Sequence, residues 1–93
     1  MQCQDLFPLG RLVATPRAME ALGRAGDAIE TFIARHATRD WGEVCEEDKH
    51  ENELSLARGF RLLSVYTLHD ATKLWIITEG DRSATTVLLP EEY

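Results

Sequence analysis

The stretch RLLSVYTLHDATKLWIITEGDRSATTVLLP, residues 61–90, decides the fold. It contains three runs rich in branched and aromatic side chains, RLLSVYTL, KLWIIT and ATTVLLP, which the polar linkers HDAT and EGDRS separate. Runs of this composition favour β-strands, and linkers this short suit hairpin loops. The stretch therefore predicts a three-stranded antiparallel meander.

Both faces of this meander carry apolar side chains, because successive residues of a strand point to opposite sides. Helices can cover one face, and the other must then meet the N-terminal segment, a second copy of the protein or a different partner. A homodimer through the second sheet face is therefore one expectation. In the first strand, one face is expected to carry Leu62, Ser64, Tyr66 and Leu68 and the other Leu63, Val65 and Thr67. In the second strand, Leu74 and Ile76 lie on one face and Trp75 and Ile77 on the other, and in the third strand Val87 and Leu89 lie on one face and Leu88 on the other.

The residues before the meander predict a short strand and three helices. GRLVATP indicates a strand that leads into a helix over about residues 16–24, since Thr15 can accept a hydrogen bond from a first-turn amide and Pro16 suits the first helical position. A second helix is expected to begin with a capping box formed by Asp27 and Glu30 and to end near Arg39.

The third helix is expected to run from Cys45 to Arg58, with Gly59 ending it. Its first two turns have almost nothing to bury, so its predicted buried contacts all lie in its second half, at Leu54, Leu56 and Ala57. The predicted fold is a single α+β domain over residues 1–93, with a short N-terminal strand, three helices and the meander.

Charge is unevenly distributed along the chain. The net charge is +1 for residues 1–39, −5 for residues 40–60 and −2 for residues 61–93, which together make the overall −6. Binding to a phosphate backbone depends on a basic surface, so an acidic chain argues against direct nucleic-acid binding. A local basic face remains open at Arg17, Arg24, Arg35 and Arg39.

The sequence shows neither an apolar stretch long enough to span a bilayer nor the features of a signal peptide at its start, so we expect a cytoplasmic protein that does not enter membranes. Its two cysteines, Cys3 and Cys45, are then expected to be free and reduced. The set His36, Asp40, Glu43, Cys45 and His50 matches no zinc-binding spacing, and no metal or other cofactor is expected.

One alternative interpretation is a small metal-independent ribonuclease, such as a toxin. Such an enzyme needs a group that moves a proton and an arginine that holds phosphate, and His36, Glu79 and Arg82 are the candidate catalytic residues. Asp, Gly, Arg and Ser are also common turn residues, so the stretch that contains Glu79 and Arg82 has an ordinary structural explanation as well.

The acidic segment 40–53 supports two interpretations. Acids at the first turn of a helix complement its dipole by about 0.3–1 kcal/mol each, so they can be a solvated helix start. Alternatively, they form a binding surface, with Glu46, Glu47, Asp48 and Glu51 as its candidate residues. Trp41, just before them, is either a plug against the core or a contact residue for a partner.

Several strings taken together, GRLVATP, RDWGEV, RLLSVY and KLWIITEGDRSATTVLLPEEY, resemble small plasmid and integrative-element proteins of proteobacteria. These are described as plasmid-related proteins and sometimes as type I restriction endonuclease subunit M. The chain has neither the glycine-rich cofactor loop nor the (Asn/Asp)-Pro-Pro-aromatic motif of a methyltransferase, so methyl transfer is not expected. The resemblance implies a mobile element, where small acidic proteins often regulate host defence machinery.

These observations together favour a small acidic, non-catalytic interaction protein, an accessory or antidefence factor that binds a host or element protein. Carboxylates on a rigid helix can imitate spaced phosphates and occupy a basic groove on a nucleic-acid enzyme. The ribonuclease with His36, Glu79 and Arg82 is the alternative function, and the identity of the protein partner stays open.

Overall fold

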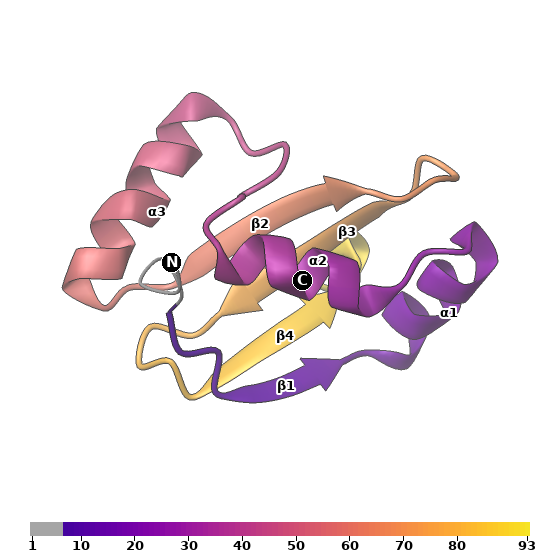
Figure 1. Cartoon of the computed structure of the whole chain (residues 1–93), viewed down its shortest axis with the longest axis horizontal. Helices are drawn as coiled ribbons and strands as arrows, with labels where there is room; N and C mark the ends of the chain where they lie inside the picture. The colour runs from indigo at the N-terminus through magenta and orange to yellow at the C-terminus, as the bar shows by residue number, and fades with distance from the viewer. Residues whose placement is uncertain (1–6) are drawn as a thin grey trace.

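The computed structural model describes residues 7–93 and shows an α+β fold of three helices and a four-stranded sheet (Figure 1). Three strands form the predicted antiparallel meander: β2 (Leu62–Thr67), β3 (Lys73–Thr78) and β4 (Ala84–Leu88). The fourth strand, β1 (Arg11–Ala14), pairs with β4 in parallel, and the strand order is β1-β4-β3-β2. The sheet is therefore mixed, with β1 at one edge and β2 at the other.

Helices α1 (Pro16–Ala25) and α2 (Ile29–Ala37) pack on one face of the sheet. In Figure 1, α2 crosses in front of the strands and α1 lies at the right. The expected start of α1 is confirmed, because the Thr15 hydroxyl accepts a hydrogen bond from the Ala18 amide and Pro16 occupies the first turn. The expected capping box of α2 is wrong. Its N-cap is Ala28, without a side-chain hydrogen bond, because the Asp27 carboxylate instead accepts the backbone N–H of His69 at 2.8 Å and contacts its Nδ1.

Helix α3 (Glu46–Arg58) stands beside β2, at the upper left of Figure 1, and Gly59 ends it in the left-handed conformation as expected. Its predicted apolar contacts are wrong in part. Leu54 is 37% exposed, Ala57 is exposed and Leu56 is only partly buried, whereas the buried residues of the helix are Asn52 and Ser55.

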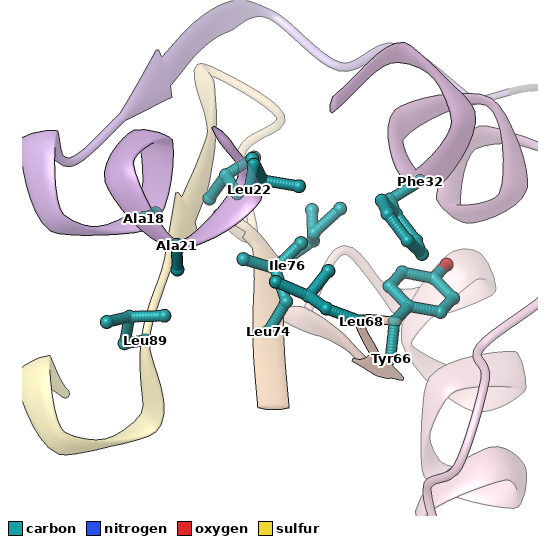
Figure 2. Close-up of a cluster of buried hydrophobic side chains, with 10 residues drawn as sticks. Ala18, Ala21, Leu22, Phe32, Tyr66, Leu68, Leu74, Ile76 and Leu89 are labelled. Atoms are coloured by element: carbon teal, nitrogen blue, oxygen red, sulfur yellow. The ribbon is translucent and has the colours of Figure 1, made fainter. Parts of the chain in front are cut away.

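The main core lies between α1, α2 and the sheet, and Figure 2 shows its side chains converging from both layers. A second, smaller cluster, centred on Trp41, Val44 and Leu62, lies at the β2 side. The main core consists of Ala18, Ala21, Leu22, Phe32, Tyr66, Leu68, Leu74, Ile76, Val87 and Leu89. The strand faces predicted to oppose each other agree with this arrangement, since Leu62, Ser64, Tyr66 and Leu68 are all buried.

The C-terminal residues cover part of the opposite face of the sheet. After β4 the chain makes a 3-10 turn, Pro90–Glu92, and the ring of Tyr93 comes to lie 5.5 Å from that of Trp75, centroid to centroid. Ile77 and Leu88 on this face are 6% and 8% exposed. From the sequence, this face was expected to meet the N-terminal segment, a second copy or a different partner, and the C-terminal residues already occupy part of it. Within residues 7–93, no helix is both long and apolar enough to cross a membrane.

Candidate interaction surface

The seven acids of residues 40–60 divide into two groups in the structure. Three of them are bound to cations: Asp40 to Arg35 at 2.7 Å, Glu43 to Lys73 at 2.7 Å, and Glu53 to Arg39. The other four, Glu46, Glu47, Asp48 and Glu51, are all exposed, and within residues 7–93 the one ion pair that any of them forms is the 3.3 Å contact of Glu46 with Lys49. These four residues, which we call the acidic surface, are the candidate binding residues expected from the sequence.

The acidic surface occupies the first two turns of α3. Glu47, Glu51 and Leu54 are spaced by four and three residues, so they share one face of the helix. Asn52 and Ser55 lie on the face turned toward the sheet and are each 5% exposed. The carboxylates of Glu47 and Glu51 and the exposed Leu54 therefore lie on a face other than the one turned toward the sheet, and Asp48 is exposed one turn before Asn52.

Asn52 attaches α3 to the sheet through the backbone of β2. Its side-chain amide donates to the Leu63 carbonyl at 2.8 Å and accepts the Leu63 N–H at 3.2 Å. The amide thus pairs with both backbone groups of one edge residue, as a neighbouring strand would. This contact fixes the position of the helix without a large apolar face.

Trp41 is buried and is not part of the acidic surface. Its ring is 4% exposed and lies 5.7 Å from the ring of His36 and 6.0 Å from that of Phe7, between centroids. Its indole N–H donates to the Glu53 carboxylate at 3.0 Å, which also binds Arg39. Of the two roles expected for Trp41, its position matches the plug, and it helps to hold the middle of α3.

The connection between α2 and α3 runs along the outer edge of β2. The Val65 N–H donates to the Trp41 carbonyl at 3.0 Å, and the Glu43 N–H donates to the Val65 carbonyl at 2.7 Å. Gly42, between them, has a φ of +77°, and a Cβ there would lie 2.0 Å from the Val65 carbonyl oxygen. Only glycine allows this close approach, so the connection is pinned against the sheet.

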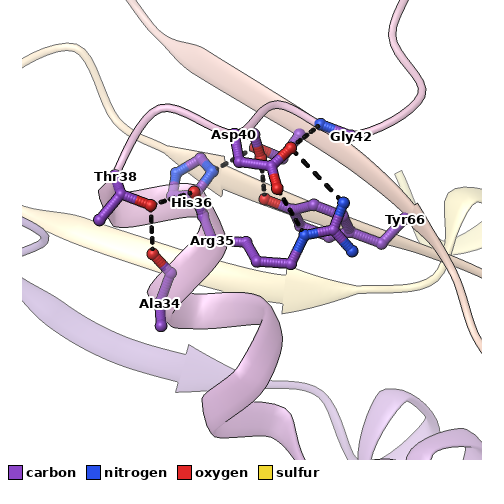
Figure 3. Close-up of polar contacts among 8 residues, drawn as sticks. Ala34, Arg35, His36, Thr38, Asp40, Gly42 and Tyr66 are labelled. Atoms are coloured by element: carbon purple, nitrogen blue, oxygen red, sulfur yellow. Dashed lines mark hydrogen bonds and ion pairs between the residues drawn. The ribbon is translucent and has the colours of Figure 1, made fainter.

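Figure 3 shows the hydrogen bonds that brace the start of this connection. The Arg35 guanidinium donates to Asp40 and holds the pKa of that carboxyl below its usual value, mainly through this hydrogen bond. The Tyr66 hydroxyl donates to the Asp40 carbonyl at 2.6 Å, and burial raises the Tyr66 pKa to about 12. Both contacts fix the path of the chain toward α3.

His36, a candidate catalytic residue in the ribonuclease interpretation, lies in α2 with no exposed surface. Its Nδ1 lies 2.5 Å from the Ser64 hydroxyl and its Nε2 2.8 Å from that of Thr78. Thr78 is in turn 2.7 Å from Thr85, whose hydroxyl donates to the Leu9 carbonyl. Four side chains therefore form one buried polar chain across the sheet.

The Leu9 carbonyl at the end of this chain sets the direction of every hydrogen bond in it, because a carbonyl can only accept. Thr85 donates to Leu9 and so accepts from Thr78, and Thr78 then accepts from His36 Nε2–H. Nδ1 is left to accept from Ser64. Burial, with a smaller contribution from the Arg82 charge, lowers the pKa of His36 to about 4. His36 is thus a neutral structural residue, and neither of its nitrogens is available to a substrate.

Arg82, the second candidate catalytic residue, binds backbone carbonyls. Its guanidinium donates to Phe60 at 2.8 Å, to Ser55 at 3.0 Å and, from the same nitrogen as the Phe60 bond, to Glu79 at 3.1 Å and Gly80 at 3.2 Å. It joins the end of α3 to the β3–β4 loop. Of Glu79, the Arg82 guanidinium contacts only the backbone carbonyl. The Glu79 carboxylate is exposed, and within residues 7–93 no hydrogen bond or ion pair joins this carboxylate to His36 or Arg82. The structure does not assemble these three residues around a space that a substrate can enter.

Metal-binding groups do not gather in the described part of the chain, where no three His, Cys, Asp or Glu side chains lie close enough to hold an ion. Cys45 is exposed at the N-cap of α3 with a free thiol, and Cys3 lies outside the described residues. Of the candidate basic face, Arg35 is engaged with Asp40, Arg39 with Glu53 and Arg17 with Glu91 at 3.4 Å.

Comparison of the chain with protein-family models, with curated proteins and with solved structures finds no significant match.

Proposed function

We propose that this chain is a small acidic interaction protein that binds a basic protein surface through the first two turns of α3. The proposal rests on the difference between the two halves of this helix. Its second half is fixed to the fold by contacts of Asn52, Glu53 and Ser55. Its first half holds the four exposed acids, and within residues 7–93 three of them, Glu47, Asp48 and Glu51, form no ion pair.

Rigid presentation is what makes such carboxylates useful for recognition. Carboxylates on a helix that is fixed to the fold lose little backbone freedom on binding, and complementary charges increase the rate of encounter. Leu54, on the same face as Glu47 and Glu51, adds a small apolar contact at the end of the acidic surface. A groove lined with lysine and arginine around an apolar pocket would complement this pattern, including a groove that normally binds nucleic acid.

The partner is proposed to be a host protein or a protein of a mobile element, with the chain acting as an accessory or antidefence factor. The resemblance to plasmid and integrative-element proteins supports this setting. The enclosed His36 and the occupied guanidinium of Arg82 lend no support to the ribonuclease alternative.

Co-purification from the native host at increasing salt tests the proposal. A tagged copy is expected to retain a specific protein that is basic at its contact surface, and the complex should weaken about tenfold or more between ~0.05 M and ~0.5 M salt, because salt screens exposed charges. The variant Glu46→Gln, Glu47→Gln, Asp48→Asn and Glu51→Gln is expected to lose that protein.

A matched control changes the net charge by the same amount elsewhere. Glu20→Gln, Asp70→Asn, Glu79→Gln and Asp81→Asn also remove four exposed acids but leave α3 intact, and this variant should retain the partner. Equal losses in both variants would show that only net charge matters. A complex that the α3 variant leaves unchanged would contradict the proposed surface.

A further inference from the structure

Within residues 7–93, no backbone group pairs with the outer side of the edge strand β1. In a parallel pair, alternate residues direct both backbone groups toward the same neighbour. The Arg11 N–H bonds the Ser83 carbonyl and the Thr15 N–H bonds the Val87 carbonyl, each at 3.0 Å. Leu12 and Ala14, at the alternate positions, therefore direct their N–H and C=O groups away from the sheet.

This edge also has exposed apolar side chains on both faces. Leu12 is 53% exposed and Val13 is 41% exposed. Natural proteins protect an open edge with charge, proline or a covering segment. The β2 edge is protected in this way by Trp41–Glu43 and Asn52, whereas the sequence Leu12-Val13-Ala14 carries no charge, proline or bulge.

An apolar groove of about 290 Å³ lies next to β1 on the helix-covered side of the sheet. Its lining includes the small side chain of Ala14 from β1 and the larger side chains of Ile29 and Ile33 from α2. The complete lining is Leu12, Val13, Ala14, Ile29, Glu30, Ile33 and Val87. The groove and the open edge are adjacent and form one surface.

We propose that a second copy of the chain binds this surface, with the two β1 strands antiparallel about a twofold axis at Val13. Leu12 of each copy then pairs with Ala14 of the other, and each pair exchanges two backbone hydrogen bonds. Val13 faces Val13 of the other copy as a pair without hydrogen bonds, where side chains lie closest. The two sheets become one continuous sheet.

Side-chain size favours this occupant and this register. Leu12 of the second copy lies beside Ala14, at the groove bounded by Ile29 and Ile33, so a large side chain meets a small one. The twofold axis is perpendicular to the sheet, so the helix-covered faces of both copies lie on the same side. Each copy supplies the leucine that covers the groove of the other.

Charge favours the same register. Arg11 is opposite Thr15 of the other copy, and Thr15 donates to the Glu92 carboxylate at 2.7 Å, with Glu91 next to it in sequence. Two carboxylates thus lie near the end of β1 that Arg11 approaches, and Arg17 pairs with one of them, Glu91. A register shifted by two residues would place Arg11 opposite Val13 and lose this attraction.

This dimer goes beyond the proposed function and does not depend on it. Since β1 and β2 are the opposite edges of the sheet, the proposed dimer would carry an α3 helix at each end. It would then present two acidic surfaces to its surroundings.

Sedimentation equilibrium over a range of protein concentrations tests the proposal. The wild-type chain is expected to approach twice its mass of 10.5 kDa as concentration rises. Val13→Lys places two like charges against each other on the axis and should raise the dimer dissociation constant at least about 100-fold. Met19→Lys, at a position that is 47% exposed in α1, makes the same change away from the edge and should leave the dimer intact.

A charge exchange tests the register. Arg11→Glu should weaken the dimer, and adding Glu91→Arg to it should restore part of the loss. Circular dichroism establishes that each variant is folded before it is compared. A chain that stays monomeric at every concentration overturns the proposal, as does a dimer that Val13→Lys leaves unchanged.

Discussion

At the scale of single residues, the fold depends on a polar chain inside its core. Ser64, His36, Thr78 and Thr85 are each completely buried, yet all of them are hydrogen-bonded. A buried polar group is costly only when it lacks a partner. Burying these four side chains therefore costs little free energy as long as His36 stays neutral.

Acid should weaken the fold through His36. Its pKa is about 4 in the folded protein and about 6.5 in an unfolded chain. Because the unfolded state takes up the proton first, the contribution of His36 to stability is complete above pH 6.5 and declines as the pH falls toward 4. We expect the free energy of unfolding by urea to fall by about 2 kcal/mol between pH 7.5 and pH 5 through this residue.

The variant His36→Gln isolates this effect, since glutamine keeps a donor and an acceptor but does not titrate. It should be less stable than the wild type at pH 7.5 and should lose much less stability on going to pH 5. Above pH 5 the carboxylates remain ionised in both proteins. The same pH slope in both proteins would show that His36 is not the group responsible.

Residue roles were only partly predictable from the sequence. The plug interpretation of Trp41 followed from a tryptophan in a polar connection and matches its burial. The role of His36 did not follow, because its partners Ser64 and Thr78 are 28 and 42 positions away. A hint was present in the alternation of β2, where Ser64 stands between buried Leu62 and Tyr66.

At the scale of elements, α3 is held by polar contacts instead of an apolar face. Local signals predicted its ends well, since capping positions and Gly59 act within one turn. The apolar pattern predicted its inward face poorly. The prediction assumed that leucines mark the buried side, whereas the helix lies against a strand edge whose backbone groups need a hydrogen-bonding partner such as Asn52.

Replacing Asn52 should therefore weaken the fold more than removing apolar contacts of α3. Asn52→Leu leaves the Leu63 N–H and C=O without their partners, and we expect a loss of about 2–4 kcal/mol in the free energy of unfolding. Hydrogen exchange at the Leu63 amide should also become faster.

His50→Leu, at an exposed position of the same helix, is the matched control and should change stability by less than about 0.5 kcal/mol. If Asn52→Leu were as stable as this control, with the Leu63 amide still protected, the amide contact would not be what attaches α3.

At the scale of the whole molecule, the sequence predicted the α+β class and the meander. It did not predict that the sheet is mixed, with β1 parallel to β4. The pairing of β1 with β4 joins residues that are 73 positions apart, such as Arg11 and Ala84, and no local pattern encodes such a partner. The acidic surface was visible as a run of charge. Which of its acids are engaged in the fold and which are exposed depends on the tertiary contacts of Arg35, Arg39 and Lys73.

Zero-length carbodiimide cross-linking in the native host tests the acidic surface most directly, because it joins a carboxylate to a partner lysine only at contact. The proposed surface predicts that the cross-links of this chain concentrate at Glu46, Glu47, Asp48 and Glu51. Glu20 and Asp70, which are also exposed, should remain largely unlinked. Cross-links spread evenly over all exposed acids, or concentrated at Glu20 and Asp70, would contradict it.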